Sequence, residues 1–351
     1  MTKDDERKGL LIGSYRLERK LGEGGMGSVW LAEHRRLRSR FAMKLAYGMR
    51  DSGERVQLKT EAERMKALDD RRIPYLVDYL DEEDFAALVM EYVDGITLEE
   101  YIRGAAPMEE EHVLSIMKGL CSIVAFLHDC RPQILYRDIK PSNFMISESG
   151  ELRLLDFGTA LTDEGRLKGS AGAGTPGYAP PEQLKGMSLR ADADVYALGA
   201  VWSYMLTGQD PSRPPFHPLK GAECGRMVGR GSKKLLDECL SADPDKRPAD
   251  ASVLLEELDK IRPGKEAFLS RLEDHAYRLS LILSLLCSCV LLFGRYNGRA
   301  SEEAELILLC IDLLVLLWCI LRDSLYTGGS FILARSWNRI YTEKRGHGLP
   351  K

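Results

Sequence analysis

Residues 136–145, YRDIKPSNFM, place an Asp, a Lys and an Asn within six positions of one another. In a phosphoryl-transfer loop, Asp138 would hold the attacking hydroxyl, Lys140 would offset phosphate charge and Asn143 would bind a metal. The Pro-Ser-Asn sequence is also typical of an ordinary polar surface turn. This stretch alone leaves both interpretations open, and the rest of the chain has to decide between them.

A glycine-rich stretch, LGEGGMGSVW, supplies Gly22, Gly24 and Gly27, with Val29 two residues further on. Glycines let a hairpin close over phosphates without side-chain clash, and Val29 could cover a base. Turns between strands use the same residues, so the triplet is weak evidence by itself. A strand is expected after these glycines, whereas a helix follows them in the dinucleotide-binding fingerprint.

Lys44 lies in the apolar strand pattern FAMKLA. A buried lysine is costly unless it meets a carboxylate or a phosphate. The helix expected next offers Glu61 and Glu63. We prefer Glu61, because Met65 and Leu68 follow it at helical spacing and would turn it inward. The alternative is that both glutamates are solvated, which is usual for helix carboxylates.

Asp156 directly follows an apolar run and precedes Phe-Gly in LRLLDFGTA. A carboxylate at a strand end beside a flexible turn suits a metal ligand that presents both oxygens. Three more motifs complete the pattern: GTPGYAPPEQ at 174–183, DVYALG at 194–199 and DKRP at 245–248.

The elements that must position these residues change character along the chain. Residues 15–47 and 75–95 have the alternation of short strands, with an acidic hairpin turn at 81–84, and residues 54–70 have a helical pattern between them. After Gly95 the pattern is helical, as in 112–130 and 193–208. We therefore predict an α+β fold with a β-rich N-lobe (15–93) carrying one key helix and an α-helical C-lobe (94–261).

The bulk composition excludes several classes of function. The 351 residues carry 49 Lys and Arg against 53 Asp and Glu, a net charge of -4, so no general attraction to nucleic acid is expected. Eight Cys without a Cys-x-x-Cys pair and six scattered His do not form a zinc pattern. The charged N-terminal extension (1–14) lacks a signal-peptide core, which favours a cytoplasmic N-terminal part.

Taken together, the ordered motifs resemble those of eukaryotic-type serine/threonine protein kinases of the bacterial kind, over residues 15–261. The resemblance implies ATP and Mg²⁺ as cofactors, Asp138 as catalytic base, Lys140 on the transferred phosphate, and Asn143 and Asp156 on the metal. Lys44, paired to Glu61, would bind the α- and β-phosphates. The nucleotide site that it implies consists of Leu21, Gly22, Gly24, Gly27, Val29, Ala42, Lys44, Met90, Glu91, Val93 and Met145, with Met90 as gatekeeper and Glu91 and Val93 at the hinge.

The resemblance also implies supporting contacts. Thr175 would dock against the catalytic loop, Glu182 would pair with Arg247, and Asp194 would anchor the catalytic loop from below. Two departures from the family pattern are Tyr136 in place of the usual His, and PPE in place of APE. The role of that His is packing and orientation, which Tyr can fill.

Arg137 beside the catalytic Asp predicts regulation, since a buried arginine requires an anion and a phosphorylated residue would supply one. The candidates are Thr159, Thr162, Ser170 and Thr175, with Ser170 favoured. A homodimer is a candidate arrangement for autophosphorylation.

Beyond a basic linker (262–278), two apolar runs at 279–294 and 306–321 are expected to be transmembrane helices, followed by a basic tail (322–351). Asp312 costs about 3 kcal/mol in the second run, and its aliphatic residues return about 4 to 6 kcal/mol. Flanking cations favour a two-pass topology in the lipid bilayer of the cell membrane, with kinase lobes and C-terminus cytoplasmic. The alternative is a buried hairpin of core helices.

The sequence thus predicts a membrane-anchored protein kinase that acts on Ser and Thr of protein substrates, without nucleic acid. Two rivals are kept: a small-molecule phosphotransferase and a catalytically weak pseudokinase scaffold. The stretch 174–183 speaks against the first, and the intact Lys44, Asp138, Asn143 and Asp156 speak against the second.

Overall fold

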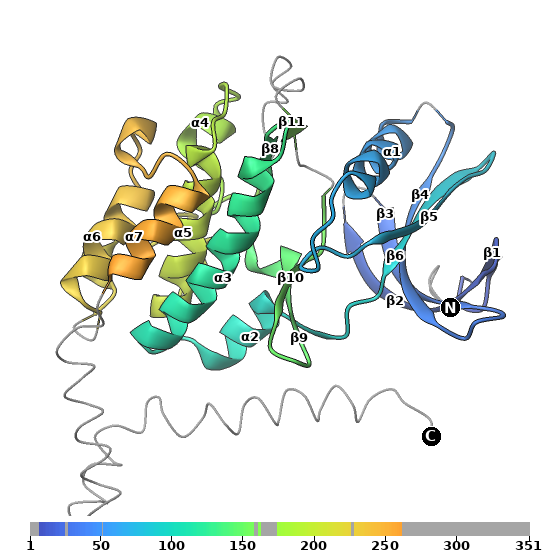
Figure 1. Ribbon diagram of the computed structural model, residues 1–351, viewed down its shortest axis with the longest axis horizontal. Helices are drawn as coiled ribbons and strands as arrows, with labels where there is room; N and C mark the ends of the chain where they lie inside the picture. The colour runs from blue at the N-terminus through green and yellow to red at the C-terminus, as the bar shows by residue number, and fades with distance from the viewer. Residues whose placement is uncertain are drawn as a thin grey trace, which may run out of the picture.

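The computed structural model describes residues 7–24, 27–50, 52–157, 161–162, 174–225 and 228–261. The expected linker, apolar runs and basic tail from 262 onward lie outside these residues, as do Thr159 and Ser170. Within them the chain forms two lobes, a sheet with one helix and a bundle of helices (Figure 1). The predicted division into a β-rich N-lobe and a helical C-lobe is confirmed.

The N-lobe is a six-stranded antiparallel sheet with strand order β1-β2-β3-β4-β6-β5. Its strands are β1 (Leu11–Ile12), β2 (Tyr15–Gly24), β3 (Gly27–His34), β4 (Arg40–Tyr47), β5 (Leu76–Asp81) and β6 (Phe85–Glu91). The acidic turn predicted at 81–84 does join β5 to β6. Helix α1 (Gly53–Lys66) connects β4 to β5 and packs on the sheet (Figure 1).

Alternation along β4 decides which residues face α1. Met43 and Leu45 belong to a core on one face of the sheet, together with Trp30. Ala46 belongs to the core that includes Leu58 of α1. Because successive strand residues point to opposite faces, Lys44 shares the face of Ala46 and points toward α1.

The C-lobe is built on α2 (Leu98–Ala105), α3 (Glu110–Asp129), α5 (Asp192–Thr207), α6 (Arg230–Cys239) and α7 (Ala251–Lys260). The short helix α4 (Pro181–Leu184) precedes α5. Among the described residues, α3 alone has the length and hydropathy of a membrane span, and 56% of its apolar window is buried in the protein. Its packing against α5 and α7 makes it the central core helix of this lobe (Figure 1).

Two small sheets lie on the C-lobe and carry its loops. One has the order β10-β9-β7, from β7 (Gly95–Thr97), β9 (Phe144–Ser147) and β10 (Leu152–Leu154). The other pairs β8 (Ile134–Leu135) with β11 (Leu161–Thr162). The segment with Asp138, Lys140 and Asn143 runs from β8 to β9 and includes the 3-10 helix η1 (Pro141–Asn143).

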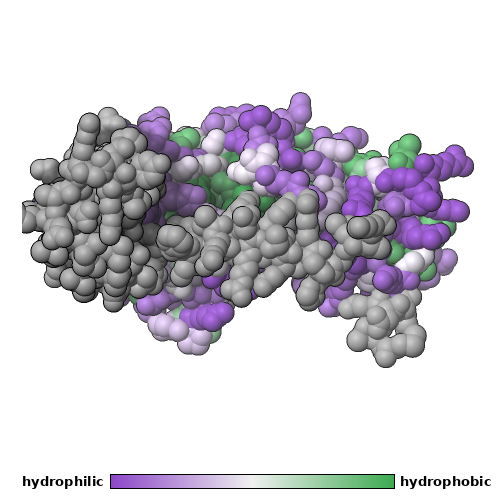
Figure 2. Space-filling view, turned by 90° about the horizontal axis from the view of Figure 1, so that it is seen from below, coloured by the Kyte–Doolittle hydropathy of each residue, from purple (hydrophilic) through white to green (hydrophobic). Residues whose placement is uncertain are grey.

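Hydrophilic residues predominate on the described part of the face shown in Figure 2, and hydrophobic residues are interspersed among them. The large exposed hydrophobic side chains come from both lobes and include Leu37, Met49 and Met187. Single exposed apolar residues of this kind are ordinary for a protein surface.

Candidate active site

Lys44 and Glu61 form a buried ion pair between β4 and α1. Lys44 Nζ lies 2.7 Å from Glu61 Oε2, and the two side chains are 7% and 1% exposed. Glu63 is exposed on the same helix. The predicted choice of Glu61 over Glu63 is therefore confirmed, and the reason is the inward face set by Leu58, Ala62 and Met65.

Asp156 joins this pair from the C-lobe. Its Oδ1 lies 2.9 Å from Lys44 Nζ, while Glu61 Oε1 accepts a hydrogen bond from the Phe157 backbone N–H at 3.3 Å. The network thus fastens the Asp-Phe segment to the N-lobe. An ammonium group has three donors, so Lys44 keeps one N–H for a further acceptor.

Electrostatics in this network follow from burial and from two neighbouring carboxylates. Burial raises the pKa of Glu61 to about 7, Lys44 opposes the rise, and Asp156 adds to it. Burial lowers the pKa of Lys44, but Glu61 and Asp156 outweigh burial and leave this pKa raised. Lys44 is therefore a cation at neutral pH.

The catalytic-loop residues form a closed set around Asp138. Lys140 Nζ lies 2.8 Å from Asp138 Oδ2, and Thr175 Oγ1 donates to Asp138 Oδ1 at 2.8 Å. Lys140 also donates to Thr175 Oγ1 at 3.1 Å. Asn143 Nδ2 donates to Asp138 twice, to the backbone O at 2.8 Å and to Oδ2 at 3.1 Å. The predicted docking of Thr175 on this loop is confirmed.

Asp194, at the start of α5, holds the loop from below as predicted. Its carboxylate accepts the backbone N–H of Tyr136 and of Arg137, each at 2.8 Å, and lies 3.0 Å from His128 Nε2. His128 Nδ1 accepts the Ala251 backbone N–H at 3.3 Å, which leaves Nε2 to donate to Asp194. Each of these polar groups is buried with a partner.

Arg137 occupies a conformation that few non-glycine residues adopt, with φ at 70°. Its backbone oxygen accepts a hydrogen bond from Gln183 Nε2 at 2.8 Å, and Gln183 is itself buried. The amide of α4 therefore supports the strained peptide that precedes Asp138.

Tyr136 stands where the resembled family has His, and it packs as expected. Its ring meets Phe157 edge to face at 6.1 Å and lies 6.3 Å from Phe144. The side chain is fully buried, and burial raises the pKa of the phenol well above its usual range. Tyr136 is thus a neutral packing residue.

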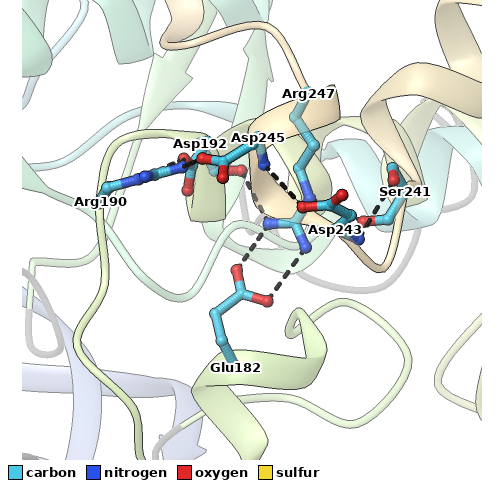
Figure 3. Close-up of polar contacts among 7 residues, drawn as sticks. All are labelled: Glu182, Arg190, Asp192, Ser241, Asp243, Asp245 and Arg247. Atoms are coloured by element: carbon cyan, nitrogen blue, oxygen red, sulfur yellow. Dashed lines mark hydrogen bonds and ion pairs between the residues drawn. The ribbon is translucent and has the colours of Figure 1, made fainter.

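Glu182 and Arg247 form the predicted buried bridge (Figure 3). Two parallel bonds of 2.6 and 3.0 Å join the guanidinium to the carboxylate, and the guanidinium also lies 5.0 Å from the Tyr196 ring. Beside it, Arg190 pairs with both Asp192 and Asp245 (Figure 3). The Glu182–Arg247 bridge ties the stretch 174–183 to the C-lobe core.

The glycine-rich turn joins β2 to β3, and Gly22, Gly24 and Gly27 belong to these strands, with residues 25 and 26 outside the description. Gly27 has φ at 116°, and a Cβ there would lie 1.9 Å from the Leu45 backbone oxygen. Only glycine fits this position. Leu21 is half-buried near the end of β2, and Val29 pairs with Lys44 across the β3–β4 ladder.

The remaining residues of the predicted nucleotide site lie on both sides of the interlobe connection. Ala42 pairs with Met90 across β4 and β6, and Val93 is buried just after β6. Met145 pairs with Arg153 across β9 and β10. Glu91 Oε2 accepts a 2.5 Å bond from Arg153 Nη2, which crosses from the C-lobe sheet to the connection.

Three residues that the sequence does not single out contact residues that it does. Arg153 donates to Glu91, His128 to Asp194 and Gln183 to the Arg137 backbone oxygen. Arg153 could have been found by the argument applied to Lys44, because it is a charge in an apolar strand three residues before Asp156. Gln183 Nε2 donates to a backbone oxygen. Because every residue has such an oxygen, no pattern of residue types in the sequence indicates this contact.

The donor set fits a magnesium ion. Asn143 is held through its amide nitrogen, so its oxygen is the atom it can offer a cation, and the Asp156 side chain is 45% exposed. Mg²⁺ prefers oxygen ligands and is commonly held by one or two protein groups together with phosphate oxygens. Within the described part of the chain, no cluster of three or more His, Cys, Asp or Glu competes for this role.

Comparison with known proteins finds sequences similar to this chain. The protein kinase domain family matches residues 15–258. The chain is 36% identical over 205 residues to the serine/threonine-protein kinase PrkC of Bacillus subtilis, covering 57% of this chain and 31% of that protein. It is 30% identical over 295 residues to PknB of Mycobacterium tuberculosis, covering 77% and 46%. It is 31% identical over 291 residues to pkn2 of Myxococcus xanthus, covering 76% and 35%. The matches span less than half the length of these relatives.

Proposed function

This chain belongs to the protein kinase family, and we propose that it transfers the γ-phosphate of ATP to Ser and Thr hydroxyls of proteins. One observation carries the proposal: Asp156 of the C-lobe contacts Lys44, whose partner Glu61 also lies in the N-lobe. The contact supports the proposed roles of Lys44 in binding phosphate and of Asp156, on the segment that follows the Asp138 loop, in binding the metal.

In the proposed reaction, Asp138 accepts the proton of the substrate hydroxyl as that oxygen bonds to the γ-phosphorus. The bond from this phosphorus to the β–γ bridging oxygen breaks, and ADP leaves with the electron pair. Lys140, 2.8 Å from Asp138, offsets charge on the transferred group, and Lys44 directs its remaining donor at the α- and β-phosphates. A Mg²⁺ ion held by Asn143 and Asp156 would neutralise phosphate charge.

The stretch 174–183 supports a protein substrate over a small molecule. Thr175 contacts Asp138 and Lys140, and Glu182 forms a buried ion pair with Arg247. A platform fixed at both ends beside the catalytic base suits an extended peptide.

The test uses the purified full chain with γ-labelled ATP, Mg²⁺ and a generic basic protein, followed by phosphoamino-acid analysis. We expect phosphoserine and phosphothreonine, and loss of the label in Lys44→Met. Absence of label in the protein substrate, or equal labelling by Lys44→Met, would contradict the proposal.

We also propose that residues 279–294 and 306–321 form a two-helix membrane hairpin that follows a kinase domain ending near residue 261. A tag at Lys351 should resist protease added to intact spheroplasts, whereas a tag near Asn297 should be cleaved. Cleavage of the Lys351 tag would overturn the two-pass topology.

Activation by phosphorylation is the last part of the proposal. Arg137 is buried beside Asp138, and burial lowers the pKa of its guanidinium although Asp194 opposes this. Thr175 is already engaged with Asp138 and Lys140. Ser170 is favoured over Thr159 and Thr162 because it lies shortly before Thr175, where Arg137 could reach its phosphate. Mass spectrometry of active enzyme should find phosphate between Asp156 and Glu182; full activity without it would refute this part.

A further inference from the structure

Helix α1, which carries Glu61, packs on the sheet through a short apolar stripe. Its buried apolar residues are Leu58, Ala62 and Met65, while Val56 is 53% exposed. Most helical stability in proteins comes from packing of an apolar face, so α1 needs another attachment to the sheet. That attachment is polar.

Arg55, one turn before Leu58, is only 2% exposed. Its Nη1 donates to the Gly48 backbone oxygen at 2.8 Å and to that of Glu83 at 2.9 Å. Its Nη2 donates to the Glu82 backbone oxygen at 2.5 Å and to the Asp81 carboxylate. A single guanidinium therefore bridges the end of β4 and the β5–β6 hairpin.

These contacts form the second of two links between β4 and α1. The first link joins Lys44 to Glu61. The second joins Gly48, four residues after Lys44, to Arg55, six residues before Glu61. Six helical residues span about 9 Å. Two links separated by that distance fix the rotation and the slide of α1 on the sheet, which one link could not do.

We propose that Arg55 is a positioning residue that holds α1 where Glu61 meets Lys44. The inference rests on the proposed kinase function, because the Lys44–Glu61 pair is its phosphate-binding half. Arg55 contacts none of the proposed reacting groups and acts only through α1.

The contacts of Arg55 with Gly48 and with the β5–β6 hairpin, here called the clamp, require arginine to form in full. A planar guanidinium presents donors in a fixed fork, whereas an ammonium is a point charge on a flexible stem. An apolar residue of similar length would leave the backbone oxygens of Gly48, Glu82 and Glu83 without this donor. Arg55→Met should therefore release both attachments, and Arg55→Lys should retain part of them.

The test is a double-mutant cycle on kcat/KM for protein phosphorylation, with Arg55→Met and Glu61→Gln. If Arg55 acts through Glu61, Arg55→Met should cost roughly 10-fold in the wild-type background and less than about 2-fold in Glu61→Gln. Equal losses in both backgrounds would show a general structural role and overturn the proposal. The matched control is Lys59→Met, which removes an exposed cation from the same helix and should change kcat/KM by less than about 2-fold.

Hydrogen exchange separates this inference from the proposed function. Residues 53–66 should exchange roughly 10-fold faster in Arg55→Met than in wild type or Lys59→Met, with α5 unchanged. Arg55→Lys, which keeps the charge, serves if Arg55→Met does not fold, and should show the same pattern at reduced size. Unchanged exchange in α1 would overturn the inference. Absence of phosphotransfer in wild type with exchange as expected would reject the kinase proposal instead.

Discussion

The two lobes hold their halves of the site by different means. In the C-lobe, Asp138 lies on a loop whose backbone is bonded to Asp194, and Asp194 is in turn bonded to His128 in the helical core. In the N-lobe, Glu61 lies on a helix attached to its sheet by a short apolar stripe and by Arg55. The C-lobe half of the site is therefore built into the core of its own lobe. The N-lobe half lies on a helix that is attached to its sheet.

This difference separates stability from function. Removing an anchor of the C-lobe half leaves buried polar groups without partners, which costs folding free energy. Replacing Glu61 by Gln removes a carboxylate whose burial opposes its charged form, and Lys44 keeps Asp156 as a partner, so the fold loses less. Changes in the first region should lower stability and activity together, and changes in the second should lower activity with a smaller loss of stability.

The largest effect is expected from Asp194→Ala. Two backbone N–H groups and His128 lose their acceptor, at a cost of about 3 kcal/mol or more in the free energy of unfolding. Denaturant unfolding of the variant, alongside a phosphorylation assay, checks this. An inactive variant of unchanged stability would break the comparison between the lobes.

Glu61→Gln should give the converse result. We expect kcat/KM for ATP to fall roughly 100-fold, because Lys44 loses the partner that orients it. The loss of unfolding free energy should be smaller than in Asp194→Ala, because Lys44 keeps Asp156 as a carboxylate partner. Glu63→Gln, on the exposed side of the same helix, is the control and should behave as wild type. A large loss of stability in Glu61→Gln would contradict the division.

The raised pKa of Glu61, about 7, predicts opposite pH dependences for activity and stability. Activity needs the carboxylate, so kcat/KM should rise roughly 10-fold between pH 6 and pH 8. The contribution of this group to stability is present below its ordinary pKa of 4.5 and is lost as pH rises through about 7. Glu61→Gln should lack both trends, and an unchanged activity limb in that variant would assign it to another group.

The smallest effect concerns the connection between the lobes. Arg153→Gln removes the 2.5 Å bond to Glu91, so the KM for ATP should rise about 3- to 5-fold with kcat unchanged. Combining Arg153→Glu with Glu91→Arg should restore part of the affinity. A drop in kcat instead of a rise in KM would place Arg153 with the catalytic loop.

Much of the fold and site followed from the sequence because local patterns carry them. Alternation in β4 and helical spacing in α1 placed Lys44 and Glu61 face to face. The contacts of Thr175, Glu182 and Asp194 came only from the family resemblance, since their partners are distant in the chain. The helical pattern is expected to reach residue 70, but the helix ends at Lys66. Asp70 lies beyond this end and accepts a hydrogen bond from Arg72, which closes a turn.

Arg55 shows what the pattern could not supply. An arginine in a polar helix is ordinarily solvated, and nothing in the sequence distinguishes it from Arg64 on the same helix. Three of its acceptors are backbone oxygens, which every sequence offers. Only the fold of β4 and the β5–β6 hairpin around it makes the clamp.

In the proposed reaction, Asp138 takes the proton of the substrate hydroxyl while other residues bind ATP. Asp138→Asn tests it by measuring nucleotide affinity and phosphate transfer on one purified sample. We predict a Kd for Mg-ATP within about 3-fold of wild type and a transfer rate lower by roughly 1,000-fold or more. Transfer at the wild-type rate, with ATP bound equally well, would show that Asp138 does not take this proton.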